Sequence, residues 1–186
     1  RIDALLTNTR FLPSTCLAIR AEGLHFALGA TIAVRRDALE SAGGLSRLLD
    51  EPADDHALAR NVEQAGYRLA WVPRLVEHHL ADEPAGRVLR RQLRWLAVIR
   101  RARPLGYLGL MLAHGLLPAL WLAGLVGFDH GRWIVGGWWG VQMWLVWRSR
   151  AILGVQAQDL ALLPVADVLA ALLYVAAWFS RARPPD

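Results

Sequence analysis

The sequence contains no lysine and only one cysteine, Cys16. A single cysteine cannot form an internal disulfide or provide the paired thiolates of a zinc site, so the chain fits a reducing compartment and redox chemistry is not indicated. No internal repeat or low-complexity tract is present, which excludes a repeat architecture. The chain begins at Arg1 with no charged-then-apolar leader, so we expect no signal peptide and interpret the sequence as a fragment of a longer protein.

Charge is scarce in the second half of the chain. Residues 104–179 carry few charged side chains and most of the nine tryptophans, whereas residues 1–103 alternate charged and apolar stretches as a soluble fold does. The composition therefore changes near Pro104. We predict a domain over 1–103, followed by a membrane region over 104–186.

Two strands and two helices are predicted in the first domain. Phe26 to Val34 is an apolar run that reads as a strand, followed by helical composition up to Gly43-Gly44. A second helix is expected from the aspartates after Ala53, one of which is a natural N-cap, to a glycine C-cap at Gly66. Tyr67 to Val72 then reads as another strand. This order predicts an α/β domain with a partly parallel sheet.

The net charge of +5 is concentrated in a basic segment at 86–103 and at the C-terminus. Apolar residues of this segment recur at helical spacing with arginines between them, which predicts an amphipathic interfacial helix. Because it leads straight into an apolar stretch, anionic lipid headgroups or a nucleotide pyrophosphate are the expected partners, and nucleic acid is not.

Three apolar segments follow, at roughly 104–126, 132–147 and 160–179. The first and third are long enough to cross a bilayer, whereas the middle one is short and rich in tryptophan, as an interfacial or re-entrant segment would be. Two to three apolar helices are therefore expected. Arginine placement favours a cytoplasmic location for the basic segment but leaves the side of the C-terminus open.

The most informative pattern joins Asp54-Asp55 to Arg91-Gln92-Leu93-Arg94-Trp95, with 35 residues between Asp55 and Arg91 and with Gly29-Ala30-Thr31 upstream. This pattern resembles the signature of ceramide glucosyltransferases and related processive synthases, of the family 21 and family 2 type. The sequence from about Arg10 to Leu125 is most similar to the bacterial ceramide-glucosyltransferase-like branch, which includes the hopanoid-biosynthesis-associated glycosyltransferase. The resemblance implies the C-terminal part of a GT-A type domain followed by a helical transmembrane region.

The resemblance implies a catalytic pair. Asp55 would be the base that takes the proton of the acceptor hydroxyl, with Asp54 as its neighbour, and the reaction would invert the anomeric carbon. Gly29, Ala30 and Thr31 would lie beneath the acceptor. From the residues alone, the alternatives are that Asp55 is a simple helix cap and that the Gly29 segment is an ordinary strand interior.

Arg91 and Arg94 are three residues apart and share a helix face, from which they could approach a pyrophosphate. The resemblance implies this donor-binding role, with Trp95 packing against sugar or acceptor. The alternative is that the arginines contact lipid phosphates and Trp95 anchors the helix at the interface.

The chain has no D-x-D motif. In the family this motif holds a divalent cation, so Mg²⁺ or Mn²⁺ is expected in the complete enzyme with its ligands outside this chain, and no metal site is expected within it. The nucleotide site would also be missing, so the fragment alone should be inactive. His56 and the pair His78-His79 are not interpreted as metal ligands, because no carboxylate or thiol recurs at a ligand spacing.

The resulting hypothesis is an inverting glycosyltransferase that moves glucose or N-acetylglucosamine from a UDP-sugar to a membrane lipid hydroxyl, either of a ceramide or of a hopanoid polyol. It would be integral to the bacterial inner membrane, with its catalytic part facing the cytoplasm. Two alternatives stay open. One is a processive polysaccharide synthase, and the other is a non-enzymatic membrane anchor or interaction protein.

Overall fold

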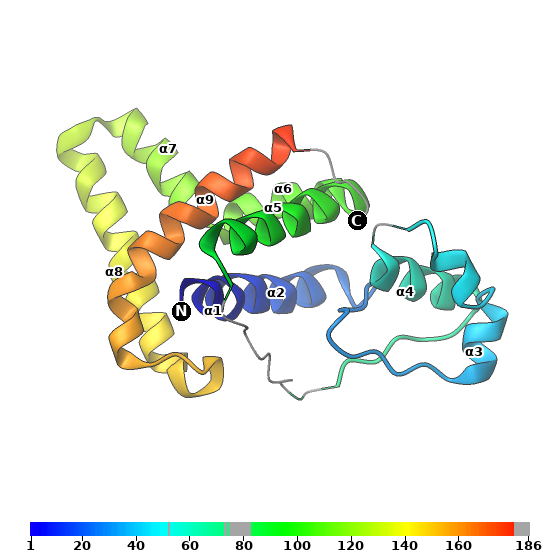
Figure 1. Cartoon of the computed structure of the whole chain (residues 1–186). Coiled ribbons are helices and arrows are strands. Elements are labelled where there is room, and N and C mark those ends of the chain that lie inside the picture. The colour runs from blue at the N-terminus through cyan, green and yellow to red at the C-terminus, as the bar shows by residue number, and fades with distance from the viewer. Residues whose placement is uncertain (52, 73, 75–82, 181–186) are drawn as a thin grey trace. The chain divides into compact units, whose positions relative to one another are not determined.

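The computed structural model describes residues 1–51, 53–72, 74 and 83–180 (Figure 1). The chain divides into two compact units. The first unit contains residues 1–16 and 83–180. The second unit contains the described residues from 17 to 74. Each unit is described separately below.

The second unit is built on two helices, α3 (Arg36–Ser41) and α4 (Asp54–Gln64), with a 3₁₀ turn, η2 (Leu45–Leu48), between them. Both helices are where the sequence predicts them. Their apolar faces enclose a small core in which Ala42, Leu58 and Val62 are buried and Leu39, Leu48 and Tyr67 pack around them. The core therefore fixes α4 against α3.

Gly66 ends α4 as predicted. Its φ of 88° is the left-handed conformation that only glycine adopts without cost. The Gly66 N–H bonds to Glu63 O at 2.9 Å and the Tyr67 N–H to Val62 O at 3.2 Å, which is the hydrogen-bond pattern of a Schellman motif. Tyr67 also packs on the Val62 core, as the residue after such a glycine often does. This motif fixes the chain direction after α4.

The predicted α/β fold is wrong. All regular elements among the described residues are helices, and both expected strands, at 26–34 and 67–72, are non-helical backbone without a ladder. A strand needs a neighbouring strand to take up its main-chain groups. Here the Gly29 N–H bonds to a side chain and the Tyr67 N–H bonds back to its own helix. The composition of these two segments alone therefore misled the prediction.

The first unit begins with α1 (Ile2–Leu6), a π-helical turn η1 (Thr7–Phe11) and the start of α2 (Leu12–Glu22), none of which the sequence analysis anticipated. It continues with α5 (Ala85–Ala102), the predicted basic helix, and then α6 (Pro104–Ala113) and α7 (Leu116–Val126). The last elements are α8 (Phe128–Leu153), the 3₁₀ segment η3 (Ala157–Leu162) and α9 (Leu163–Phe179). Figure 1 shows α7 and α8 as a helical hairpin.

Two cores hold this unit together, and α9 belongs to both. One joins α1, α8 and α9 through buried residues that include Leu5, Val146 and Ala166. The other joins α5, α6 and α9 around Tyr107, Tyr174 and Ala177. The Tyr107 and Tyr174 rings stack with centroids 4.6 Å apart, and the hydroxyl of each donates to the other's carbonyl. Because α9 serves both cores, its position sets that of α1 and α5.

The three predicted apolar segments take different forms. The segment containing η3 and α9, Ala157–Phe179, is long and apolar enough to cross a membrane. The predicted 104–126 segment is divided into α6 and α7, bent by 60° at His114 and Gly115, and the two together would make a second candidate span. The middle segment is longer than predicted, because α8 continues as one helix of 26 residues. By length and composition, α8 is not among the candidate spans in the described part of the chain.

Candidate active site

Asp55 lies in the first turn of α4, where its carboxylate joins two parts of the second unit. Its Oδ2 accepts the Gly29 N–H at 3.0 Å, and its Oδ1 accepts the His56 N–H at 2.8 Å. The helix cap itself is Ala53, without a side-chain bond, so neither aspartate takes the N-cap position. The structure thus brings the predicted base and the predicted acceptor segment into direct contact.

Asp54 is placed differently from Asp55. It is exposed, and its Oδ1 accepts the N–H of the adjacent Asp55 at 3.0 Å. Asp55 is half-buried and tied to a second segment of the chain. Of the two carboxylates, Asp55 is therefore the one held in a fixed orientation, as a general base requires.

The segment from Phe26 to Thr31 lies against the start of α4 through two contacts. One is the Gly29 bond to Asp55, and the other is a stack of the buried Phe26 ring on the His56 ring, with centroids 5.6 Å apart. Beyond Gly29 the chain turns, and the Thr31 hydroxyl donates to Ala30 O at 2.7 Å. Gly29, Ala30 and Thr31 are exposed, so this turn is open to a ligand.

No three His, Cys, Asp or Glu side chains within the described ranges gather as a possible metal site. His56 is occupied by its ring stack, while His78 and His79 lie outside the described residues. The residues described here thus do not supply a ligand set for the divalent cation that the resemblance implies.

Arg91, on α5 in the first unit, is engaged by two carboxylates. Its Nη2 lies 2.6 Å from Asp3 Oδ2, its Nη1 pairs with Glu83, and its guanidinium lies 5.8 Å from the Trp95 ring centroid. Gln92 also donates to Asp3, at 2.8 Å. Burial acts to lower the pKa of Arg91, but the bond to Glu83 and the charges of Asp3 and Glu83 outweigh it and raise that pKa. A pyrophosphate would have to compete with both carboxylates for this side chain.

Arg94 lies one turn further along α5 and is exposed. Within the described ranges it has no hydrogen-bond or ion-pair partner, and beside it Trp95 keeps 37% of its surface exposed. Arg87 and Arg90 are exposed on the same face, at positions three and four residues apart along the helix. Of the two predicted donor-binding arginines, Arg94 is the one whose charge is available to an incoming anion.

Asp55 and Arg94 belong to different units. That they converge on one cavity therefore stays a prediction.

The sequence analysis missed a buried polar cluster in the first unit. Asp167 of α9 is 1% exposed and is paired with Arg10 of η1. The indole N–H groups of Trp138 and Trp139 both donate to its Oδ2 at 3.0 Å. The available signal was a lone carboxylate within an otherwise apolar segment, which needs a partner wherever it is buried.

Comparison with known families identifies the class of this protein. The protein is a glycosyltransferase, an enzyme that transfers a sugar from a donor to an acceptor. The chain belongs to Glycosyl transferase family 21, whose model matches residues 1–182. Searches of curated proteins and of solved structures gave no match.

Proposed function

We propose that this chain carries the acceptor side of an inverting glycosyltransferase that moves a hexose, glucose or N-acetylglucosamine, from a UDP-sugar to the hydroxyl of a membrane lipid. The acceptor would be a ceramide or a hopanoid polyol. The observation that carries the proposal is the oriented carboxylate of Asp55 beside the exposed turn at Gly29.

The chemistry requires a base at this point. A lipid hydroxyl is a weak nucleophile, and a carboxylate within hydrogen-bond reach can accept its proton while the oxygen attacks the anomeric carbon opposite the departing nucleotide. The bonds from Gly29 and His56 leave further lone-pair positions on the Asp55 oxygens for that proton. In this proposal the hydroxyl lies over the turn at 29–31.

The leaving nucleotide gains negative charge as the glycosidic bond breaks, and a cation near the pyrophosphate would stabilise it. Arg94 is proposed for this role because its guanidinium is exposed and has no partner within the described part of the chain. Trp95, partly exposed beside it, would pack against the sugar or the acceptor. Arg91 would act mainly by holding α5 to Asp3 and Glu83.

A membrane location is proposed from the apolar helices. Ala157–Phe179 could span a bilayer, and the exposed arginines of α5 could contact anionic headgroups. The enzyme would lie in the bacterial inner membrane with its catalytic part facing the cytoplasm. A lipid acceptor could then react without leaving the bilayer.

The decisive experiment incubates membranes containing the full-length protein with labelled UDP-glucose or UDP-N-acetylglucosamine and identifies the labelled lipid by mass. Asp55→Asn should lower transfer by about 10²-fold to 10⁴-fold, because the amide cannot accept the proton. Asp54→Asn is the matched control and should lower it far less. Transfer by the Asp55→Asn protein at the normal rate would remove Asp55 as the base, and a long polysaccharide product would replace lipid glycosylation with a processive reaction.

A further inference from the structure

Asp167 is the most completely enclosed charge in the described part of the first unit. Its Oδ1 accepts from Arg10, whose side chain is 10% exposed, and its Oδ2 accepts from Trp138 and Trp139. A carboxylate with three donors, one of them a guanidinium, has its hydrogen-bonding needs largely met. The charge is thus neutralised within the protein rather than by solvent.

Asp167 lies near the middle of the candidate span, ten residues after Ala157 and twelve before Phe179. An ionised carboxylate at that depth is costly unless it faces a protein partner. The span satisfies this requirement by having two faces. One carries Asp167, Ala170, Tyr174 and Ala177, all buried.

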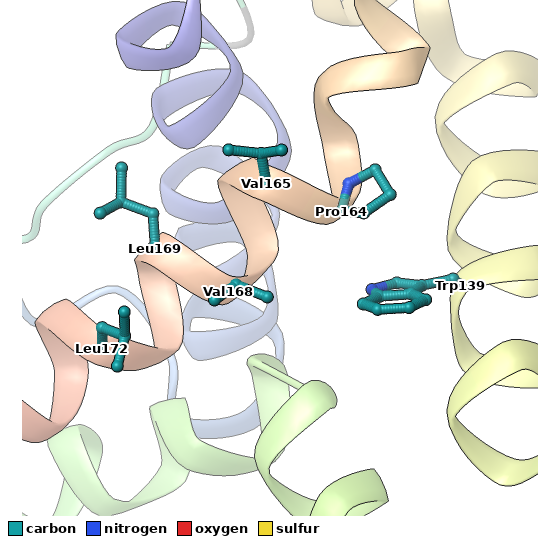
Figure 2. Close-up of a pocket in the computed structure, with 6 residues that line it drawn as sticks. All are labelled: Trp139, Pro164, Val165, Val168, Leu169 and Leu172. Carbon is teal, nitrogen blue, oxygen red and sulfur yellow. The ribbon is translucent and has the colours of Figure 1, made fainter. Parts of the chain in front are cut away.

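The opposite face of α9 is apolar and open. Val165, Val168 and Leu172 line a groove of about 450 Å³ together with Trp139, as Figure 2 shows. Trp139 therefore lies between the open groove and the buried carboxylate, because its ring borders the groove while its N–H donates to Asp167. The carboxylate is separated from the apolar surface by this indole.

The partner of Asp167 comes from a distant part of the sequence. Arg10 lies in the π-helical turn η1, 157 residues before Asp167. A π-helical turn changes the direction of the side chains that follow it. A second bond fixes the same turn to α8, because Asn8 donates to Leu153 O at 2.8 Å. The turn is thus attached both to α9, which carries Asp167, and to α8, which carries the two tryptophans that bond to it.

We propose that Arg10 and Asp167 form an obligatory pair that couples docking of the α1–η1 segment to membrane insertion of α9. The carboxylate of Asp167 enters the bilayer only when η1 is docked and supplies its counter-charge. The α1–η1 segment, too short and too polar to be recognised as a membrane element, is then an integral part of the membrane unit. This inference rests on the membrane placement of α9 and not on sugar transfer.

A charge-neutralisation cycle in the full-length protein tests the pair. Arg10→Gln leaves the carboxylate alone, and Asp167→Asn leaves the guanidinium alone while keeping an oxygen that accepts the two indole N–H bonds. Each should lower the carbonate-resistant membrane fraction by about fivefold or more, because one charge is left buried without a partner. The double variant should recover to within about twofold of the wild type, since no unpaired charge remains.

Matched controls change an exposed charge of the same kind. Arg20→Gln on α2 and Asp129→Asn at the start of α8 should leave the carbonate-resistant fraction unchanged. The coupling is overturned if both single variants behave as the wild type, or if the double variant is no better than the worse single one. A wild-type protein that carbonate extracts completely would overturn the membrane placement and the coupling together, whereas a loss of sugar transfer alone bears only on the proposed function.

Discussion

The main-chain N–H of Gly29 donates a hydrogen bond to Oδ2 of Asp55 across 3.0 Å, although the two residues lie 26 positions apart in the chain. This bond gives the carboxylate a fixed orientation and places an exposed turn directly beside it. The relationship makes Gly29 a useful position at which to test whether the acceptor approaches this turn.

Gly29→Ala should raise the KM for the lipid acceptor several-fold without changing thermal stability. A Cβ at this position would lie 3.5 Å from Asp55 Oδ2, which is ordinary van der Waals contact, so the bond to Asp55 can persist. Any loss would therefore report on an approaching substrate rather than on the fold. Initial rates over a range of lipid concentrations measure the effect, and an unchanged KM would place the acceptor elsewhere.

Arg91→Gln and Arg94→Gln should affect different properties. Loss of Arg91 leaves Asp3 and Glu83 without their counter-charge, and because the Arg91 side chain is 25% exposed we expect a loss of only about 1–2 kcal/mol in the free energy of unfolding. Loss of Arg94 should leave stability unchanged and lower kcat/KM about 10-fold to 100-fold. Thermal unfolding followed by tryptophan fluorescence, together with the transfer assay, separates the two.

The control for this pair is Arg90→Gln, which removes an exposed arginine from the same face of α5. It should change neither the free energy of unfolding nor kcat/KM strongly. If Arg90→Gln lowered transfer as much as Arg94→Gln, the arginines would act through general attraction of anions rather than through a specific site.

Gly66→Ala should destabilise the second unit by about 1 kcal/mol, because alanine at a φ of 88° is strained. Among the described residues, chain neighbours aside, no atom lies within 4 Å of the added Cβ, so the cost would be conformational rather than steric. Gly66→Asn is the matched variant and should cost less, since asparagine tolerates the left-handed region better. Denaturant unfolding measures both, and equal losses would contradict the explanation.

Gly115→Ala should disrupt the first unit. Gly115 has a φ of 44°, and the Trp138 indole occupies the space that its Cβ would need. We expect a loss of about 3 kcal/mol, because Trp138 must move and its bond to Asp167 is then broken. Gly109→Ala on α6 has open space and should change the free energy of unfolding by less than about 1 kcal/mol. Thermal unfolding of the detergent-solubilised protein distinguishes the two variants.

Local signals predicted α3, α4 and α5 well. The glycine after α4 and the arginine and leucine spacing of α5 are properties of neighbouring residues, and both helices lie where these signals place them. The strands failed because a strand depends on a partner segment that its own composition does not specify. The length of α8 was underestimated because apolar composition ends at its charged residues, whereas the helix continues to Leu153.

In the candidate site, too, features set by neighbouring residues were predictable and features set by distant segments were not. Asp55 could be selected from its sequence context, but its bond to Gly29 depends on how the chain returns to α4. The capture of Arg91 by Asp3, 88 residues away in the chain, has no local signal. Arg91 and Arg94 look equivalent in the sequence, and the ion pairs of Arg91 with Asp3 and Glu83 distinguish them in the structure.

The segment formed by α1 and η1 carries two side chains on which other helices depend. Asp3 holds Arg91 and Gln92 of α5, and Arg10 holds Asp167 of α9. Trimming residues 1–11 to obtain a more tractable expression fragment would remove the ion-pair partners of α5 and of α9 at the same time. A deletion series for crystallisation or cryo-microscopy should therefore keep residues 1–11 and look elsewhere for removable segments.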